Sequence, residues 1–436
     1  MEIRKGISSV VLIVIVCLSA LFSFASRAQT LSYAYVHNFP NSFSQADIDT
    51  IDLYSIDLLK TASSSIPLEA KHALEHEPRE PQVLFNLIRD DKNEQDYYWV
   101  SPLFAFDCEV GMTCTPNAGG PSASIAVSYI AIDKTKVSFE YAERLSELVG
   151  QYKSTSEFST QAQEIKDSLK KSFPSAEVTH GIISFAGRLH ADANDLWIIA
   201  DIVPLFSERG ERGELKGIAA DLVQDVLDKM ALSQEILSAP WERIAKESMS
   251  KSNVLVFSII RTDERDEVFH WITPVSRNMH GLYGINKPYF DSFDEVPRTY
   301  RVGTLLADYR YDVAISKGFR VKAYDSWQAL VTALINNEID TVFGSQGAIE
   351  FGCNPNQFKC ETITLTSKYD TSTAYLALSK KDTCVLVLEK LKLAAAEVKM
   401  SEKFNERLSS WSDMVSQEYG IAHHTERGVV HLWNPN

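Results

Sequence analysis

Two close pairs of cysteines are the residues whose type and spacing most directly suggest covalent chemistry. Cys108 and Cys114 bracket a turn-like segment, and Cys353 and Cys360 bracket another. In an oxidising compartment each pair is expected to close a local loop as a disulfide bond. A zinc site would need C-x2-C spacings and histidine partners, which both pairs lack. We therefore expect two local disulfides, with Cys384 remaining a buried, reduced thiol.

Sequence motifs for catalysis, nucleotide binding and metal binding are missing from the chain. It holds no Gly-x-Ser-x-Gly elbow, no P-loop, no dinucleotide-binding glycine motif and no helical pair of histidines at metal-binding spacing. His423, His424 and His431 lie in a polar stretch near the carboxyl terminus, where we expect solvated side chains. The sequence thus favours a binding protein over an enzyme, with no cofactor and no metal ion.

The amino terminus has the pattern of an export signal. Arg4 and Lys5 precede an apolar run, residues 7–24, which ends in a small-residue stretch at residues 25–28. A membrane-spanning helix needs about 20 apolar residues, and this run ends at a cleavage-like site instead. We expect residues 1–28 to be a signal peptide that is removed on export to the periplasm, the alternative being an uncleaved anchor.

The chain is acidic, with 43 Lys and Arg residues against 58 Asp and Glu residues and a formal net charge of −15. Such a surface repels nucleic acids and anionic membranes. After the apolar run at the amino terminus, no segment is apolar for long enough to cross a bilayer. We therefore expect a monomer in solution without a nucleic acid partner.

The sequence contains two copies of one unit. Residues 84–103 match residues 256–275 without gaps, at an offset of 172 residues. A second match joins residues 129–134 to residues 375–380, at an offset of 246 residues. The first copy therefore lacks about 74 residues that the second copy contains, and has only a Gly/Pro/Ser-rich loop at 104–124 in their place.

Strands alternate with helices along the second copy. Apolar runs of strand length are separated by segments in which the apolar residues recur with helical spacing. The expected strands are 196–202, 254–260, 300–305 and 340–344, and the expected helices are 217–230 and 327–336. This alternation favours parallel or mixed α/β sheets covered by helices on both faces.

Six short segments of the second copy, in this order, resemble the family 3 periplasmic solute-binding proteins, the polar amino acid type. They are Pro204-Leu-Phe, Gly217-Ile-Ala-Ala-Asp-Leu, Pro240-Trp-Glu-Arg, Arg261-Thr-Asp-Glu-Arg265, Phe269-His-Trp-Ile-Thr-Pro274 and Val302-Gly-Thr304. The resemblance covers residues 196–411. It implies two α/β lobes joined by two crossing strands, near residues 279–287 and 372–380.

The resemblance implies an α/β fold of the class II periplasmic-binding-protein type. Within the complete domain, residues 190–425, lobe one would comprise 190–278 and 381–425, and lobe two would comprise 288–371. The first copy, residues 29–180, would then be an extra single α/β lobe without a lobe two. Because a lone lobe cannot form a cleft, we expect it to have a structural or docking role.

The resemblance also implies ligand-binding residues. Arg265 matches the arginine that clamps the ligand α-carboxylate, a contact suited to the planar guanidinium. The matching residue of the first copy is Asn93, so that copy has lost the clamp. Thr304 would offer donors to the same carboxylate. Phe206 would wall the ligand unless it belongs to the core, and Trp241 would line the cleft mouth unless it only caps its helix.

Two departures from the family pattern concern the ligand. Amino acid binders of this family pair the ligand ammonium with an aspartate, and the matching residue here is Ser345. They also stack an aromatic residue on the ligand, and the matching residue here is Val203. Without the aspartate an ammonium would lose a charge-assisted hydrogen bond. A carboxylate without an amino group therefore fits Arg265 and Ser345 as well as an amino acid does.

The expected function is binding of a small polar carboxylate or amino acid-like ligand by hinge closure of two lobes. As an exported solute-binding protein, the chain would deliver this ligand to a membrane permease for ABC-type uptake. Two alternatives stay open. One is a sensory or docking protein with a degenerate cleft, and the other is an enzyme of the same fold, of a dehydratase-like kind.

Overall fold

The computed structural model describes residues 31–433 apart from 38, 41, 65–67, 71–80, 109–114, 117–123, 204, 307 and 354–361. The expected signal peptide lies outside the described residues, as do Cys114 and Cys360 and therefore both expected disulfide pairings. No described helix is long and apolar enough to cross a membrane. The described chain divides into two compact units, the first formed by residues 31–108 and 124–188 and the second by residues 189–433.

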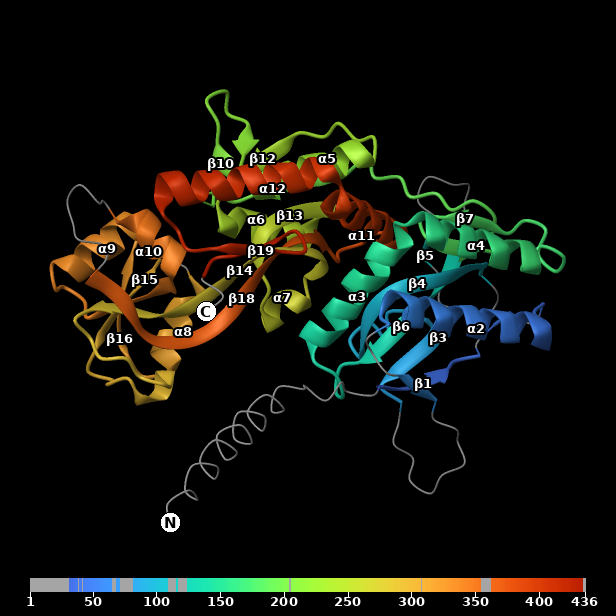
Figure 1. Ribbon diagram of the computed structural model, residues 1–436, viewed down its shortest axis with the longest axis horizontal. Helices are drawn as coiled ribbons and strands as arrows, with labels where there is room; N and C mark the ends of the chain where they lie inside the picture. Colours follow the sequence, from blue (N-terminus) through green and yellow to red (C-terminus); the bar gives the residue numbers. More distant parts are fainter. Residues whose placement is uncertain are drawn as a thin grey trace, which may run out of the picture. The chain divides into compact units, whose positions relative to one another are not determined.

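The first unit is a mixed sheet whose core lies beneath three helices (Figure 1). Its strands are β1 (Leu31–Tyr35), β2 (Leu68–Ala70), β3 (Val83–Ile88), β4 (Tyr97–Asp107), β6 (Ser124–Asp133), β7 (Glu177–Thr179) and β8 (Ile182–Ser184). The helices are α2 (Gln45–Ala62), α3 (Phe139–Lys153) and α4 (Ser156–Leu169). The strand order is β2-β1-β3-β6-β4-β8-β7. A two-residue strand, β5 (Thr115–Pro116), lies between two segments that are not described.

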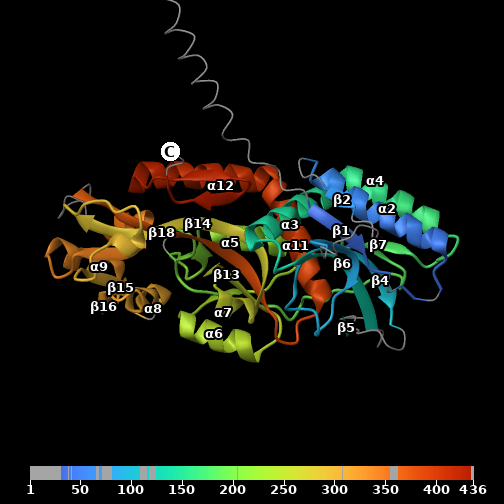
Figure 2. The same cartoon turned by 90° about the horizontal axis from the view of Figure 1, so that it is seen from below.

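The second unit consists of two lobes, of which lobe one carries helices on both faces of its sheet. Figure 2 shows α12 on one side of β13 and β14, and α6 and α7 on the other. Its elements are β9 (Trp197–Ala200), β10 (Glu208–Arg209), β11 (Leu215–Lys216), α5 (Ile218–Lys229), β12 (Ile236–Ser238), α6 (Trp241–Ser250), β13 (Val254–Ile260), α7 (Asp263–Asp266), α11 (Val385–Met400), α12 (Glu402–Met414), the π-helical turn η3 (Val415–Tyr419), β19 (His424–Glu426) and β20 (Val429–His431). Alternate residues of β9 point into two different apolar clusters, with Ile198 packing beneath α5 and α11 and Ile199 beneath α6.

Lobe two is a smaller α/β layer built around parallel strands. Its elements are the 3-10 helix η1 (Phe293–Glu295), β15 (Arg301–Leu305), α8 (Tyr309–Ser316), β16 (Arg320–Tyr324), α9 (Trp327–Ile335), β17 (Thr341–Ser345) and α10 (Gln346–Gly352). β15 pairs in parallel with both β16 and β17. Serine side chains cap two of the helices, since Ser326 precedes α9 and Ser345 precedes α10. Ser345 itself, and Trp327 next to the other cap, line the cavity described below.

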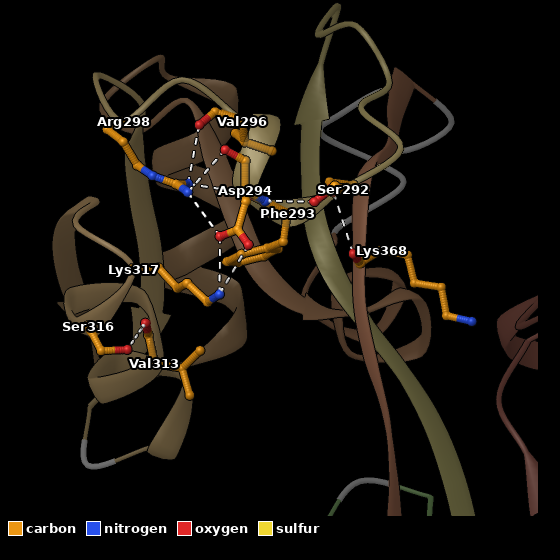
Figure 3. A network of polar contacts seen from close by, with 10 residues as sticks. Ser292, Phe293, Asp294, Val296, Arg298, Val313, Ser316, Lys317 and Lys368 are labelled. Carbon is orange, nitrogen blue, oxygen red and sulfur yellow. Dashed lines mark hydrogen bonds and ion pairs between the residues drawn. The ribbon is translucent and has the colours of Figure 1, made fainter.

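A small polar network holds η1 against the end of α8 in lobe two. The Asp294 carboxylate accepts a hydrogen bond from Lys317 Nζ at 3.1 Å and one from Arg298 at 3.2 Å (Figure 3). The hydrogen bond from Lys317 lowers the pKa of Asp294. The side chain of Lys368 points away from this carboxylate (Figure 3). The network lies on the surface, so we expect it to contribute little to the stability of the lobe.

Two long antiparallel strands join the lobes, β14 (Phe269–Ile285) and β18 (Ile363–Ser379) (Figure 1). β18 pairs with β13 in lobe one, and β14 pairs with β17 in lobe two. The sheet order β12-β9-β13-β18-β14-β17-β15-β16 therefore runs through both lobes. This arrangement confirms the predicted fold class, a two-lobed α/β domain with two connecting strands.

The strand register places the crossing differently from the sequence prediction. Residues 279–285 pair with residues 363–371, so the expected second segment, 372–380, lies in lobe one opposite residues 269–278. The sequence could not show this, because both strands continue unbroken through the two lobes. The expected strands and helices of the second unit otherwise agree with the structure to within a few residues.

The carboxyl-terminal histidines are not solvated as we expected. β19 and β20 form a hairpin, and β20 pairs with β14 at Ser276 and Arg277. His431 is buried, with 5% of its surface exposed, and its ring stacks on His424. Burial and the neighbouring imidazole lower the pKa of His431 to about 4. The prediction of a solvated tail was wrong because alternation over so few residues is too short to indicate a strand.

The first unit has the same strand arrangement as lobe one of the second. The orders β2-β1-β3-β6-β4-β8 and β12-β9-β13-β18-β14-β20 correspond strand by strand, with the same parallel and antiparallel pairs. A bulge interrupts both β3 and β13, and the residue within it has a positive φ in each case, 64° at Asn86 and 59° at Ser258. Asn86 and Ser258 are 172 residues apart, which is the offset of the first sequence match.

Buried lysines repeat this correspondence. Lys153 of α3 donates from Nζ to the carbonyl oxygen of Pro102 on β4 at 2.5 Å. Lys399 of α11 donates in the same way to the carbonyl oxygen of Pro274 on β14. Each ammonium therefore ties the helix that follows the repeated strand to a bulged strand beneath it.

Candidate functional site

A cavity of about 640 Å³ lies in the second unit and is lined by residues of both lobes. Lobe one contributes the loop after β9, the start of α6, the end of β13 and Arg265 of α7. Lobe two contributes the segment from the end of β15 into α8, and the start of α10. The connecting strand β14 forms part of the wall through Ser276, Asn278 and His280. Strand ends and helix amino termini therefore converge on one space, an arrangement that open α/β sheets commonly use for ligand sites.

Arg265 and Trp241 form the cationic side of this cavity. The Arg265 guanidinium lies over the Trp241 ring, 4.1 Å from the ring centre, and donates from one terminal nitrogen to the Ile260 carbonyl oxygen at 2.6 Å. Burial lowers the pKa of Arg265, although Asp308 and Tyr309 of lobe two oppose this shift. Among the described residues Arg265 has no ion-pair partner. Its position is fixed by stacking and by one backbone contact, which leaves further N–H donors for an anion.

The residue that matches Arg265 in the first unit is Asn93, which keeps the contact with a backbone carbonyl but not the charge. Asn93 donates from Nδ2 to the Ile88 carbonyl oxygen at 2.8 Å, the same contact that Arg265 makes with Ile260. Asn93 also accepts from the Asp90 backbone N–H at 2.9 Å, so both ends of its amide are used within the loop. It carries no charge to offer a ligand.

The other residues singled out from the sequence occupy different surroundings. Phe206 lines the cavity and also packs against Trp411 in the core, so the two positions considered above do not exclude each other. Ser345 lines the cavity while its Oγ accepts from the Ala348 backbone N–H at 3.3 Å at the start of α10. Thr304 is fully buried and does not line the cavity, whereas Leu305 and Leu306 beside it do.

A buried ion pair that sequence reasoning missed forms the opposite wall. Asp308, the N-cap of α8, accepts from Arg310 Nε at 2.7 Å and from a terminal nitrogen of Arg310 at 2.5 Å. Arg310 is only 6% exposed. Burial alone would raise the pKa of Asp308, but the charge and hydrogen bonds of Arg310 outweigh this effect and hold the pKa below its usual range. The pair brings two opposite charges into the cavity wall without a net charge.

His280 connects this ion pair to the strands between the lobes. It lies on β14, contacts Arg310 through Nδ1 at 3.1 Å, and contacts Ser372 Oγ of β18 through Nε2. Because a guanidinium can only donate, Nδ1 must accept and Nε2 must carry the proton. Burial and the Arg310 charge lower the pKa of His280 to about 3, so the ring is neutral near pH 7. A strand of the hinge and the first turn of α8 thus share one polar cluster.

Asp201 anchors the lobe-one side of the cavity. It follows β9 and accepts from the Ile202 backbone N–H at 2.8 Å and from the Trp241 backbone N–H at the start of α6. Burial raises the pKa of Asp201. The carboxylate therefore fixes the amino end of α6, and with it the ring on which Arg265 stacks.

Sequence signals for the missed residues were weak. An aspartate at an N-cap followed two residues later by an arginine, as in Asp308 and Arg310, is common at surface helices. His280 is a single histidine in an apolar strand, where a core position is the ordinary interpretation. Asp201 stands after a strand, like many loop residues. Only the meeting of three separate segments in space distinguishes them.

Comparisons with known proteins give matches to solved structures alone. No family model and no curated protein matches the chain. A histidine kinase sensor domain with similarity to periplasmic binding proteins is 12% identical and covers 51% of this chain and 97% of its own, with a TM-score of 0.43. An ancestral arginine-binding protein bound to arginine is 18% identical over 50% of this chain and 99% of its own, with a TM-score of 0.42. The GluR0 ligand-binding core with L-glutamate is 16% identical over 50% of this chain and 97% of its own, with a TM-score of 0.42.

Proposed function

We propose that the second unit is a solute-binding domain that closes its two lobes over a small ligand with an anionic group. The observation that carries this proposal is the position of Arg265, a partly buried cation in a two-lobed cavity, without an ion-pair partner among the described residues. Moving a charge out of water is costly unless an opposite charge is bound. A ligand carboxylate would offset this cost.

The geometry around Arg265 suits a carboxylate. A guanidinium offers parallel N–H donors that match the two oxygens of a carboxylate. Stacking on Trp241 restricts its rotation, so less side-chain entropy is lost when the anion binds. The loss of water from the cavity on closure would strengthen the contact further. Arg265 is therefore the residue from which we expect most of the binding free energy.

Apolar side chains on facing lobes support closure. Ile202 of lobe one is 45% exposed and Leu306 of lobe two is 70% exposed, and both line the cavity. Exposed aliphatic side chains at the rim of a cavity gain from being covered by the opposite lobe. In this proposal the open and closed states differ by little free energy, and the ligand bridges the lobes in the closed state.

The cellular setting is part of the proposal. The pattern of residues 1–28 supports export to the periplasm, and such a domain would pass its ligand to a permease for ABC-type uptake. A sensory or docking role for the whole chain is the second candidate, and the shared strand order and bulges of the two units favour it. We infer that the units arose by duplication and that the first, with Asn93 in place of the arginine, serves in docking rather than in ligand binding.

We also propose the local disulfides Cys108–Cys114 and Cys353–Cys360. Each pair lies within one short segment, which supports a local disulfide in an oxidising compartment. Cys384 lies partly buried at the start of α11 and packs against the lobe-one core. We expect it to remain a thiol.

The test is isothermal titration of the mature chain with a panel of small carboxylates and amino acids, repeated with Arg265→Ala. Loss of a bidentate charged contact should weaken binding about 30-fold or more. Arg320→Ala is the matched control, because Arg320 is an exposed arginine of β16 outside the cavity lining and should bind as the wild type does. Equal affinities for wild type and Arg265→Ala would remove the proposed role of Arg265.

A further inference from the structure

The carboxylates of the cavity bear on which ligands it can hold, because a carboxylate is the strongest partner for a buried ligand ammonium. Three carboxylates line the described cavity, those of Asp201, Glu242 and Asp308. A carboxylate can pair with a ligand cation only if its own contacts leave it available. This availability depends on the donors that already contact the carboxylate and on its exposure to solvent.

Asp308 is committed to Arg310. Both of its oxygens accept from the guanidinium, and Oδ1 accepts in addition from the Arg310 backbone N–H at 2.9 Å. Turning this carboxylate toward a ligand would leave the guanidinium of Arg310, which is only 6% exposed, without its anion. Breaking a buried ion pair in this way is strongly unfavourable. Asp308 therefore serves the wall of the cavity and not a ligand cation.

Asp201 and Glu242 are no better placed. Asp201 is held by the backbone N–H groups of Ile202 and Trp241, which tie it to the start of α6. Glu242 is exposed in the first turn of α6, where its charge is favourable for the helix and where water competes for it. Neither carboxylate is a buried, uncommitted acceptor.

Two other polar groups of the lining favour an anion. Arg265 brings a positive charge with no ion-pair partner among the described residues. Ser258, at the β13 bulge, lines the cavity, and its buried Oγ has no hydrogen-bond partner among the described residues. Much of the remaining lining is apolar, with Val203, Phe206 and Trp327 among it.

We infer that the ligand of this cavity is an organic acid with an apolar body and no amino group. The inference rests on the proposed function and narrows it. A carboxylate would bind Arg265, and its uncharged chain would lie against the apolar wall. The corresponding amino acid would have to bury its ammonium without a carboxylate partner, a loss that we expect to weaken binding at least tenfold.

Matched pairs of ligands test this inference on the mature wild-type chain. Each pair shares a carbon skeleton and differs in the amino group: propanoate and alanine, 4-methylpentanoate and leucine, 3-phenylpropanoate and phenylalanine, glutarate and glutamate. Titration calorimetry should give the highest affinity for an acid, at least tenfold above its amino acid partner. If an amino acid binds more tightly than its matched acid, the inference is overturned and the proposed function stands. If no member of any pair binds, the proposed function itself fails.

A gain-of-function variant gives a second, independent readout. Ser345 lines the cavity and caps α10, and aspartate is an equally good N-cap, so Ser345→Asp should fold as the wild type does. The new carboxylate would repel an acid and attract an ammonium. We expect the ratio of acid to amino acid affinity to fall at least tenfold in Ser345→Asp. An unchanged ratio in a folded variant, shown by an unaltered melting temperature, would count against the inference.

Discussion

A terminal nitrogen of Arg310 lies 3.1 Å from Nδ1 of His280, so a buried guanidinium of lobe two donates to a neutral imidazole on a connecting strand. The contact joins the first turn of α8 to β14, close to the point where the strands pass from one lobe to the other. Protonating His280 would place two positive charges in contact inside the protein. The relationship thus makes the stability of this region depend on pH.

The first prediction concerns that pH dependence. The pKa of His280 is lowered from 6.5 to about 3 in the folded chain, so the unfolded chain binds one more proton between these values. The contribution is complete above about pH 6.5 and is lost as the pH falls toward 3. By pH 5 the loss amounts to about 2 kcal/mol. Urea unfolding at pH 7 and pH 5 should show a difference about 2 kcal/mol larger for wild type than for His280→Gln. His190→Gln, at an exposed histidine, is the control and should behave as the wild type does.

The second prediction concerns Asp340, which immediately precedes β17. Its carboxylate accepts from Arg301 Nε at 2.9 Å and from Lys287 Nζ at 3.1 Å, and the hydrogen bond from Arg301 is the largest cause of its lowered pKa. Because the site is partly solvated, we expect Asp340→Asn to cost about 1 kcal/mol at pH 7. The lowered pKa means that this stability is present above about pH 4 and is lost as the pH falls further.

Chemical denaturation at pH 7 and pH 3 checks the Asp340 prediction. Wild type and Asp340→Asn should differ at pH 7 and converge toward pH 3. The surface pair of Lys322 and Glu338 is the matched control, since both side chains are half exposed. Glu338→Gln should change the free energy of unfolding by less than about 0.5 kcal/mol at either pH. If Glu338→Gln lowered the free energy of unfolding strongly and Asp340→Asn did not change it, the prediction for Asp340 would be contradicted.

The positions of strands and helices in the second unit could be predicted because their signal is local. Val254–Ile260 is an apolar run interrupted only by Ser258, and the apolar residues of α5 repeat with helical spacing, so each pattern is complete within one segment. The crossing point of the hinge could not be predicted in this way. It depends on the register of β14 against β18, and no residue in either strand marks where one lobe ends.

The same difference between local and non-local signals applies to the residues of the candidate site. Arg265 and Trp241 were predicted because each stands in a short motif of the family resemblance. Asp308, Arg310 and His280 were missed, because their roles arise only when β14 and α8 meet. Thr304 shows the converse, since its motif predicted a contact with the ligand while the chain direction buries its side chain and presents its neighbours to the cavity.

The third prediction concerns the rim of the cavity. If Ile202 and Leu306 are covered when the lobes close, a charge at Leu306 must be desolvated in the closed state. Leu306→Asp should therefore weaken binding of the best acid about tenfold while leaving the melting temperature of the free protein unchanged. Ile315→Asp is the control, because Ile315 is 49% exposed on α8 and does not line the cavity. Equal effects of the two substitutions would show that the rim is not covered on closure.

The fourth prediction concerns the cysteines. The mature chain is unfolded without a reductant and then alkylated. Only Cys384 should be modified, because the other four cysteines that follow residue 28 are expected to be in disulfides. Peptide mapping should then link Cys108 to Cys114 and Cys353 to Cys360. A peptide that joined one pair to the other would contradict the assignment of two local loops.

The last prediction separates the charge of Arg265 from its shape. Arg265→Lys keeps the positive charge but loses the planar donor pair and the guanidinium stack on Trp241. If the ligand carboxylate accepts two parallel hydrogen bonds, Arg265→Lys should bind about tenfold or more weakly than wild type, and Arg265→Ala more weakly still. Trp241→Leu, which keeps the guanidinium but removes the ring beneath it, should weaken binding by a smaller factor, because the arginine would then have to be ordered when the ligand binds. A lysine variant that bound as tightly as wild type would mean that the cavity attracts its ligand through charge alone, and the two-oxygen contact would have to be abandoned.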